Sequence, residues 1–143
     1  MNTNGASPNL GRSIFAVVAG IVVGAGLSLG TDEILHVMKI YPPWTERMSD
    51  GLFVLATAYR LLFSVLGSYV IAWLAPWRPM KHAIVGGVLG LIVATFGAVV
   101  TWNKDLGPHW YSVILAVTAL PCAWVGGWLW LKRDPQRAAY ARA

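Results

Sequence analysis

Four long apolar runs dominate this chain and restrict its fold more than any other feature. They extend over Ser13–Gly30, Gly51–Trp73, Ile84–Trp102 and Tyr111–Leu131, and each contains 18 to 23 residues. A helix of about 20 apolar residues crosses the hydrocarbon core of a bilayer. Only helices and closed barrels satisfy their backbone hydrogen bonds in lipid, and barrel strands would be short and alternating. We therefore expect an all-α polytopic membrane protein whose four transmembrane helices form an antiparallel up-down bundle.

The polar segments around these runs are short, which leaves no room for a separate soluble domain. We expect a disordered cytoplasmic N-terminus over residues 1–12, a transmembrane domain over 13–131 and a basic cytoplasmic tail over 132–143. The expected helices cover about 13–38, 51–75, 82–102 and 110–131. A cleaved signal peptide is a less favoured alternative, because the first run is longer than a typical signal-peptide core and no A-x-A site follows it.

Positive charges are distributed unevenly between the two sides of such a bundle. The net charge is +5, and seven basic residues fall on one side against three on the other. The seven are Arg12, Arg78, Lys81, Lys132, Arg133, Arg137 and Arg142, and the three are Lys39, Arg47 and Lys104. The positive-inside rule then places both termini in the cytoplasm. The basic balance is a topology signal, so we expect the lipid bilayer and no nucleic acid as a partner.

Arg60 is the one charged residue inside the run Gly51–Trp73. A charge at that depth costs at least ~2.5 kcal/mol, so it normally faces a partner or a cavity. The nearest acidic residues, Asp32 and Glu33, follow the first apolar run and fall near the same membrane level. His36 lies three and four residues further along the same helix, within reach of both carboxylates. These spacings predict an ion-pair or ligand cluster made of Asp32, Glu33, His36, Tyr59 and Arg60.

This cluster has several possible roles that the sequence leaves open. It can be a static ion pair that sets the helix register, a site for a small solute, or a proton-coupled site using the carboxylate and histidine. A metal site could draw on Glu33, His36 and His109, but the Glu-x-x-His spacing occurs once and di-metal bundles need two copies. We therefore expect no cofactor. Hydrolase and phosphate-binding motifs are missing from the sequence, so we assign no catalytic residue and do not favour an enzyme.

Glycines at four-residue spacing mark faces where helices can approach closely. The first and third runs contain these pairs: Gly20 with Gly24, Gly26 with Gly30, and Gly86 with Gly90. We expect the first helix to pack on the third, or on a second copy. We therefore expect the chain to form a homo-oligomer or to belong to a larger membrane complex.

Several short strings occur together in the chain: Thr31–His36, Tyr41–Trp44, Ala56–Arg60, Arg78–Met80, Thr101–Asn103 and Ala119–Trp124. With them the chain resembles small, uncharacterised bacterial four-helix inner-membrane proteins. The resemblance implies a membrane location and no particular activity. The favoured function is an accessory, assembly or interaction subunit, and the alternative is a small-solute or proton-coupled transporter that uses the polar cluster. A metal-binding membrane enzyme is less favoured.

Overall fold

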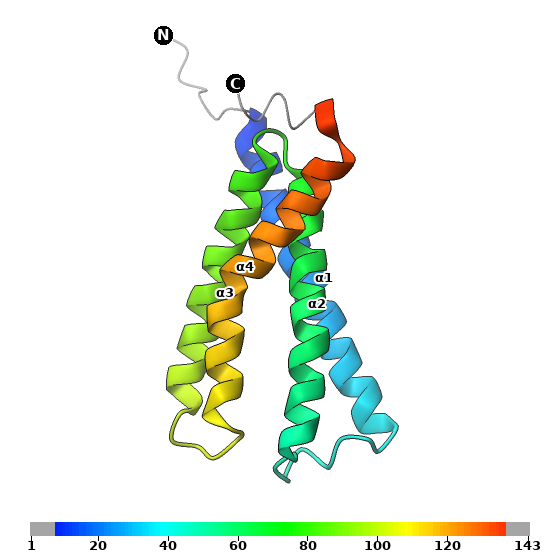
Figure 1. The fold of residues 1–143 in the computed structure, drawn as a ribbon, viewed down its shortest axis with the longest axis vertical. Helices are drawn as coiled ribbons and strands as arrows, with labels where there is room; N and C mark the ends of the chain where they lie inside the picture. The colour runs from blue at the N-terminus through cyan, green and yellow to red at the C-terminus, as the bar shows by residue number, and fades with distance from the viewer. Residues whose placement is uncertain (1–7, 137–143) are drawn as a thin grey trace.

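The computed structural model describes residues 8–136, and this part of the chain contains four α-helices and no strand. The helices are α1 (Pro8–Val37), α2 (Asp50–Leu74), α3 (Pro79–Thr101) and α4 (His109–Arg133). Each is long and apolar enough to cross a membrane. They run alternately up and down (Figure 1). The prediction of an all-α, four-helix antiparallel bundle is confirmed.

All four helices extend beyond the apolar runs that define them at one or both ends, and the extensions of α1 and α4 bear on the predicted terminal segments. Helix α1 begins at Pro8, so residues 8–12 are helical and the predicted disordered segment over 1–12 is wrong for this part. Proline is well suited to the first turn of a helix, and the Ser13 hydroxyl donates to the Asn9 carbonyl at 2.8 Å. Helix α4 continues through Lys132 and Arg133, whose charges favour a helix C-terminus. Residues 1–7 and 137–143 of the predicted terminal segments lie outside the described residues.

The four helices form two antiparallel pairs that converge at one end and diverge at the other (Figure 1). Helix α2 packs against all three others, whereas α1 and α4 make no contact with each other. At the narrow end, α1 begins and residues 75–78 join α2 to α3. At the wide end lie the two longer loops, residues 38–49 and 102–108. The most buried side chains are small and belong to Ala16, Ala56, Ala72, Ala75, Ala83 and Ala123.

Glycine permits the closest helix contact in the bundle, between α1 and α2. A Cβ atom on Gly20 would lie 2.5 Å from the Gly67 carbonyl oxygen, and one on Gly67 would lie 2.7 Å from that of Gly20. Gly24 faces the same helix, and a Cβ atom on it would lie 3.1 Å from the Phe63 carbonyl oxygen. The predicted packing of the first helix on the third is therefore wrong for this face. The spacing of glycines indicates which face of a helix can be approached closely. It does not indicate which helix packs there, because glycine has no side chain that could select a partner.

The remaining predicted glycines have different surroundings. A Cβ on Gly86 would meet the side chain of Ile71 in α2 at 2.3 Å. One on Gly90 would approach the Ala119 side chain no closer than 4.0 Å. Gly26 and Gly30 have no atom within 4 Å of such a Cβ, so their face of α1 is uncovered.

Helix α4 changes direction near its middle, where Pro121 lies (Figure 1). Proline has no N–H to donate and its ring crowds the preceding turn, which bends a helix. The bend carries the second half of α4 across α2. There Gly126 meets the α2 backbone, and a Cβ at that position would lie 2.5 Å from the Val65 carbonyl oxygen.

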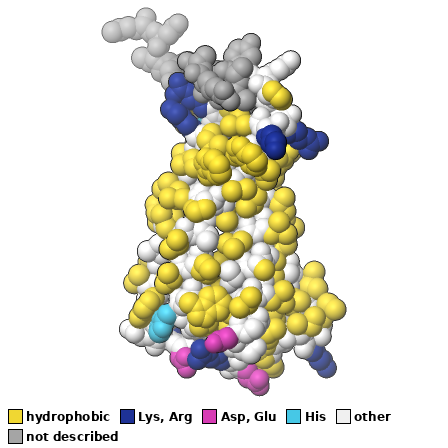
Figure 2. Space-filling view, in the orientation of Figure 1, with side chains coloured by type: hydrophobic (Ala, Val, Ile, Leu, Met, Phe, Trp, Pro, Cys, Tyr) yellow, Lys and Arg dark blue, Asp and Glu magenta, His cyan; other side chains and the backbone are white. Residues whose placement is uncertain are grey.

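A wide apolar belt covers the visible face of the molecule between its two charged ends (Figure 2). Large side chains on the belt are exposed, for example Val93 at 71% and Phe96 at 70%. Soluble monomers rarely expose apolar patches larger than a few hundred Å². The belt is therefore the surface that apolar helices present to lipid.

Helix α1 ends in a strained residue, because Lys39 has a φ of 58°. The amide of Ile40 donates to the Leu35 carbonyl at 3.0 Å and that of Lys39 to the His36 carbonyl at 2.9 Å, the pattern of a left-handed helix cap. A side chain in that conformation costs about 1 kcal/mol, which glycine avoids. We expect Lys39→Gly to raise the free energy of unfolding by about 1 kcal/mol in a detergent-denaturation titration. Lys39→Ala keeps the Cβ and should give no gain, so an equal gain from both variants would contradict this explanation.

Candidate functional site

An ion pair between Asp32 and Arg60 joins α1 to α2 near the wide end. The Arg60 guanidinium donates through Nη2 to the Oδ2 atom of Asp32. Side-chain exposure is 10% for Asp32 and 29% for Arg60, so the pair is largely shielded. Each charge neutralises the other, which removes most of the cost of placing either of them inside an apolar bundle.

Two tyrosines complete the coordination of the Asp32 carboxylate. The Tyr59 hydroxyl donates to Oδ1, so both carboxylate oxygens accept a hydrogen bond. The Tyr41 hydroxyl lies 3.1 Å from that of Tyr59, and because the Tyr59 proton is already donated, Tyr41 donates to it. Burial raises the pKa of the Tyr41 hydroxyl above its usual range, which keeps it protonated as this chain of bonds requires. Tyr41 belongs to the loop after α1, so the network ties that loop to both helices.

His36 lies beside this network but does not bond to a carboxylate. Its Nδ1 atom lies 2.8 Å from the backbone carbonyl oxygen of Asp32. Its ring stacks on Trp44 with centroids 3.8 Å apart and meets Tyr41 edge-on at 5.3 Å. The pairing of His36 with the Asp32 or Glu33 carboxylate is not formed, because Arg60 and Tyr59 occupy the Asp32 oxygens. Aromatic rings and one carbonyl hold the histidine instead.

Glu33 points away from the cluster and is exposed. One residue along a helix is a rotation of about 100°, so two neighbouring carboxylates cannot face the same partner. Within residues 8–136, Glu33 has no hydrogen bond or ion pair. The structure thus brings together Asp32, Tyr59 and Arg60, places His36 next to them and leaves Glu33 outside.

The three residues considered for a metal site are not gathered into one. His109 lies at the start of α4, where its Nε2 atom is 2.9 Å from the Trp102 carbonyl oxygen. Its ring lies against Trp102 with centroids 4.2 Å apart. In the described part of the chain, no three His, Cys, Asp or Glu side chains form a cluster suited to a metal ion. Glu33, His36 and His109 therefore make no joint site here.

Two tyrosines of this region, Tyr41 and Tyr111, were not predicted from the sequence to belong to the site. Tyr41 is 4% exposed and bonds to Tyr59. Tyr111 of α4 is an electrostatic neighbour of Arg60 and packs on Phe53 with ring centroids 5.0 Å apart. The position of Tyr41, in the loop directly after the helix that carries Asp32, is a signal that could have identified it. For Tyr111, the sequence contains no comparable signal.

Contacts between the loops link the two helix pairs at the wide end, beyond this network. Arg47 donates to Asp105 at 2.9 Å, which links the two loops through an exposed ion pair. Gly107 lies against the Phe53 ring, so that a Cβ there would be 2.5 Å from the ring edge. Residues from both helix pairs therefore contact one another at the wide end, next to the polar network.

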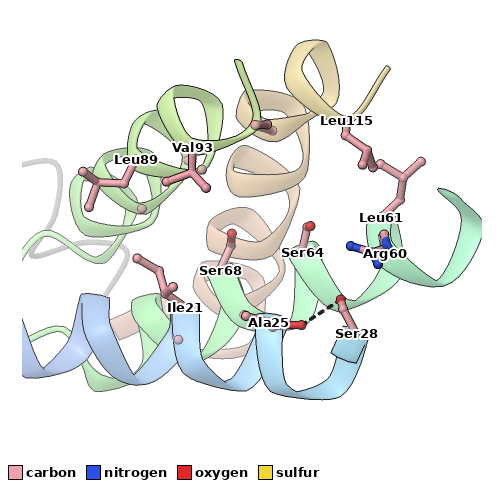
Figure 3. A pocket seen from close by; sticks show the side chains of 18 of the residues that line it. Ile21, Ala25, Ser28, Arg60, Leu61, Ser64, Ser68, Leu89, Val93 and Leu115 are labelled. Carbon is pink, nitrogen blue, oxygen red and sulfur yellow. Dashed lines mark hydrogen bonds between the residues drawn. The ribbon is translucent and has the colours of Figure 1, made fainter. Parts of the chain in front are cut away.

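A cavity of about 440 Å³ lies between the four helices, on the narrow-end side of the ion pair. Arg60 is the lining residue of α2 nearest the wide end, and Ile71 is the one nearest the narrow end. Figure 3 shows the Arg60 guanidinium with the hydroxyls of Ser28, Ser64 and Ser68 around the cavity. The Ser28 hydroxyl donates to the Gly24 carbonyl of its own helix at 2.9 Å. Glycines form much of the wall: Gly20, Gly24, Gly67, Gly86, Gly87 and Gly90.

Comparisons of the chain with protein-family models, curated proteins and solved structures find no match. The fold and surface define a class: a multi-pass, four-helix membrane protein. Its site consists of a largely shielded Asp32–Arg60 pair and an adjoining cavity with many glycines in its wall.

Proposed function

We propose that this chain is a protein of the bacterial inner membrane, with both termini in the cytoplasm, and that it acts as an accessory or assembly subunit. The excess of basic residues at the narrow end supports this orientation. So does the resemblance to small bacterial four-helix inner-membrane proteins. The observation that carries the subunit role is the uncovered face of α1 at Gly26 and Gly30.

This face of α1 has small residues that another helix can approach closely, and it carries one negative charge, that of Glu33. Gly26, Gly30 and Glu33 follow one another at four and three residues, so they share a side of the helix. Small residues at that spacing let another helix backbone approach closely. Glu33 is exposed one turn before the end of α1, where it favours a Lys or Arg on the partner. The partner is therefore a transmembrane helix with small residues and a basic side chain near the outer boundary.

A different subunit fits this face better than a second copy of the chain. Two copies in one membrane have the same orientation, so packing these faces together brings two Glu33 carboxylates close to each other. Like charges at that distance oppose association. The proposal thus favours a heteromeric complex over the homo-oligomer.

Affinity purification in mild detergent tests this function. The wild-type chain should retain one membrane subunit at constant stoichiometry, and Gly26→Leu with Gly30→Leu should reduce that retention about tenfold or more. Glu33→Lys should weaken it as well, since it reverses the charge that the partner faces. Gly11→Leu is the matched control, because Gly11 also has open space around it but lies near the start of α1, fifteen residues and about 22 Å along the helix from Gly26. Retention of the subunit by the double leucine variant would contradict the proposal.

Labelling of single cysteines tests the orientation. Cys122 is the one cysteine of the chain, so Cys122→Ala provides a background without thiols. In intact cells, a membrane-impermeant maleimide should label Lys104→Cys, and it should label Lys81→Cys only after permeabilisation. The reverse pattern would place the termini outside.

A small-solute transporter is the second candidate, favoured by the presence of Arg60 in the cavity wall. Lysine keeps the charge but loses the planar fork of donors. If transport is the function, Arg60→Lys should insert and fold normally yet abolish solute movement in proteoliposomes. Unchanged transport in that variant would remove Arg60 from the mechanism.

A further inference from the structure

We infer that the cavity binds the ring of a lipid-soluble quinone, with one ring carbonyl accepting a hydrogen bond from Arg60 and the other accepting one from Ser64. The inference does not rest on the proposed subunit role, because Gly26 and Gly30 do not line the cavity. Binding pockets for small molecules usually measure about 300–1,000 Å³, and this cavity of about 440 Å³ falls within that range. Such pockets combine an apolar wall with a few polar groups, as this one does.

The polar groups of the cavity lie deep in the membrane-spanning helix α2. At the helical rise of about 1.5 Å per residue, Arg60 and Ser68 lie about 15 and 27 Å from Asp50, along a helix of 25 residues, or about 37 Å. They therefore occupy the middle of the span, away from both ends. A phospholipid headgroup is charged and hydrated, so placing it at this depth would be costly. A quinone ring is neutral and dissolves in hydrocarbon, so it can reach these groups.

Hydrogen-bond donors form a line along α2 in the cavity wall. Arg60, Ser64 and Ser68 lie on successive turns, and Figure 3 shows their polar ends around the cavity. Ser64 is exposed, and within residues 8–136 neither serine hydroxyl makes a hydrogen bond. A guanidinium has five N–H donors, and the Asp32 Oδ2 atom accepts from Nη2 alone. The wall therefore favours a ligand that supplies acceptors.

The spacing of these donors suits the two carbonyl oxygens of a quinone. Successive turns place Arg60 and Ser64 about 6 Å apart along the helix axis. With C=O bonds of about 1.2 Å on opposite sides of a six-membered ring, the two oxygens of a para-quinone lie about 5 Å apart. A ring lying along α2 can therefore accept from both residues at once. The quinone is neutral, which suits the site because Asp32 already neutralises Arg60 and a bound anion would be uncompensated.

The cavity opens sideways between α1 and α3, where a ring can enter it from the bilayer. Side chains at this edge are exposed: Ile21 at 41%, Leu89 at 40% and Val93 at 71%. Helix α1 contacts α3 only slightly and does not contact α4. The apolar tail of a quinone can remain among the lipid chains while its ring is bound. An acyl chain could enter by the same route, but it would leave the donors of Arg60 and Ser64 without acceptors, which is unfavourable in an apolar site.

Native mass spectrometry of the purified full chain tests the inference with two probes. Decylubiquinone has the ring carbonyls, and decylbenzene has a ring and the same tail without them. The wild-type protein should bind one decylubiquinone per chain and should bind decylbenzene about tenfold more weakly. Gly90→Leu should lose decylubiquinone, because a Cβ on Gly90 meets one atom, the Ala119 Cβ at 4.0 Å, and a larger side chain would project into the cavity. Gly97→Leu should keep it, since Gly97 lies on the same helix in open space and does not line the cavity.

Two serine variants test the carbonyl contact separately from the shape of the cavity. Ser64→Ala removes one donor and should weaken the binding of decylubiquinone about threefold to tenfold. Ser28→Ala is the matched control in the opposite wall, because the Ser28 hydroxyl already donates to the Gly24 carbonyl at 2.9 Å and a quinone has no proton to donate to it. This variant should bind decylubiquinone as the wild type does. Far-UV circular dichroism checks that each variant is folded.

Each other outcome would overturn a defined part of the inference. Absence of binding to the wild type, or binding by Gly90→Leu at the wild-type level, would exclude the cavity as a quinone site. Equal binding of the two probes, or equal binding by Ser64→Ala and the wild type, would exclude recognition of the carbonyls. A change in oligomer mass in Gly90→Leu would mean that a protein helix fills the cavity. Gly26→Leu with Gly30→Leu should keep the quinone, so failure of the subunit proposal is seen separately.

Discussion

Asp32→Leu is expected to lower the free energy of unfolding by about 3–5 kcal/mol, the cost of breaking a buried ion pair by removing one partner. The variant leaves the Arg60 charge without its partner and deprives the Tyr59 hydroxyl of its acceptor. It also releases the link between α1 and α2 near the wide end. Denaturation in a mixed detergent series, followed by far-UV circular dichroism, measures the change.

Two controls separate burial from charge pairing. Arg47→Ala breaks the exposed ion pair with Asp105, whose side chains are 46% and 84% exposed, and should cost at most about 1 kcal/mol. Asp32→Leu combined with Arg60→Leu removes both charges, and replacing a buried pair by apolar residues is often neutral. The double variant should therefore recover most of the stability. If Asp32→Leu were no more harmful than Arg47→Ala, the ion pair would have no role in holding α1 on α2.

Gly126→Leu is expected to destabilise the bundle by about 3 kcal/mol or more, at the upper end of what overpacking costs. A Cβ there would lie 2.5 Å from the Val65 carbonyl oxygen and 2.8 Å from the Tyr69 amide nitrogen. Both are backbone atoms of α2, so no side-chain rotation can relieve the clash and the two helices must separate. Thermal unfolding in detergent should show a large fall in Tm.

Gly97→Leu is the matched control for this substitution. Gly97 is also a glycine within a transmembrane helix, but a Cβ there meets nothing within 4 Å. Leucine favours the helix over glycine by about 0.5–1 kcal/mol, so this variant should be as stable as wild type or slightly more stable. Equal losses from both variants would mean that leucine disturbs membrane insertion and not the contact of α2 with α4.

Much of the polar site could be predicted from two properties of the sequence. A lone arginine in an apolar run requires a partner, and depth along each helix placed Asp32 and Glu33 near it. Which carboxylate pairs with Arg60 could not be predicted, because neighbouring residues differ by about 100° around the helix and the rotation of α1 depends on its packing. That rotation is set where Gly20 meets Gly67. It turns Asp32 inwards and Glu33 outwards.

The sequence by itself determined the number of helices, their antiparallel order and the presence of one buried cation, because length and hydropathy act locally along the chain. The tertiary structure decided which glycine faces are covered, which tyrosines reach Asp32, and that α1 and α4 stay apart over a cavity. These outcomes depend on backbone distances between segments far apart in sequence. Glycine, having no side chain, permits such contacts without specifying the partner, so only the packed bundle could decide them.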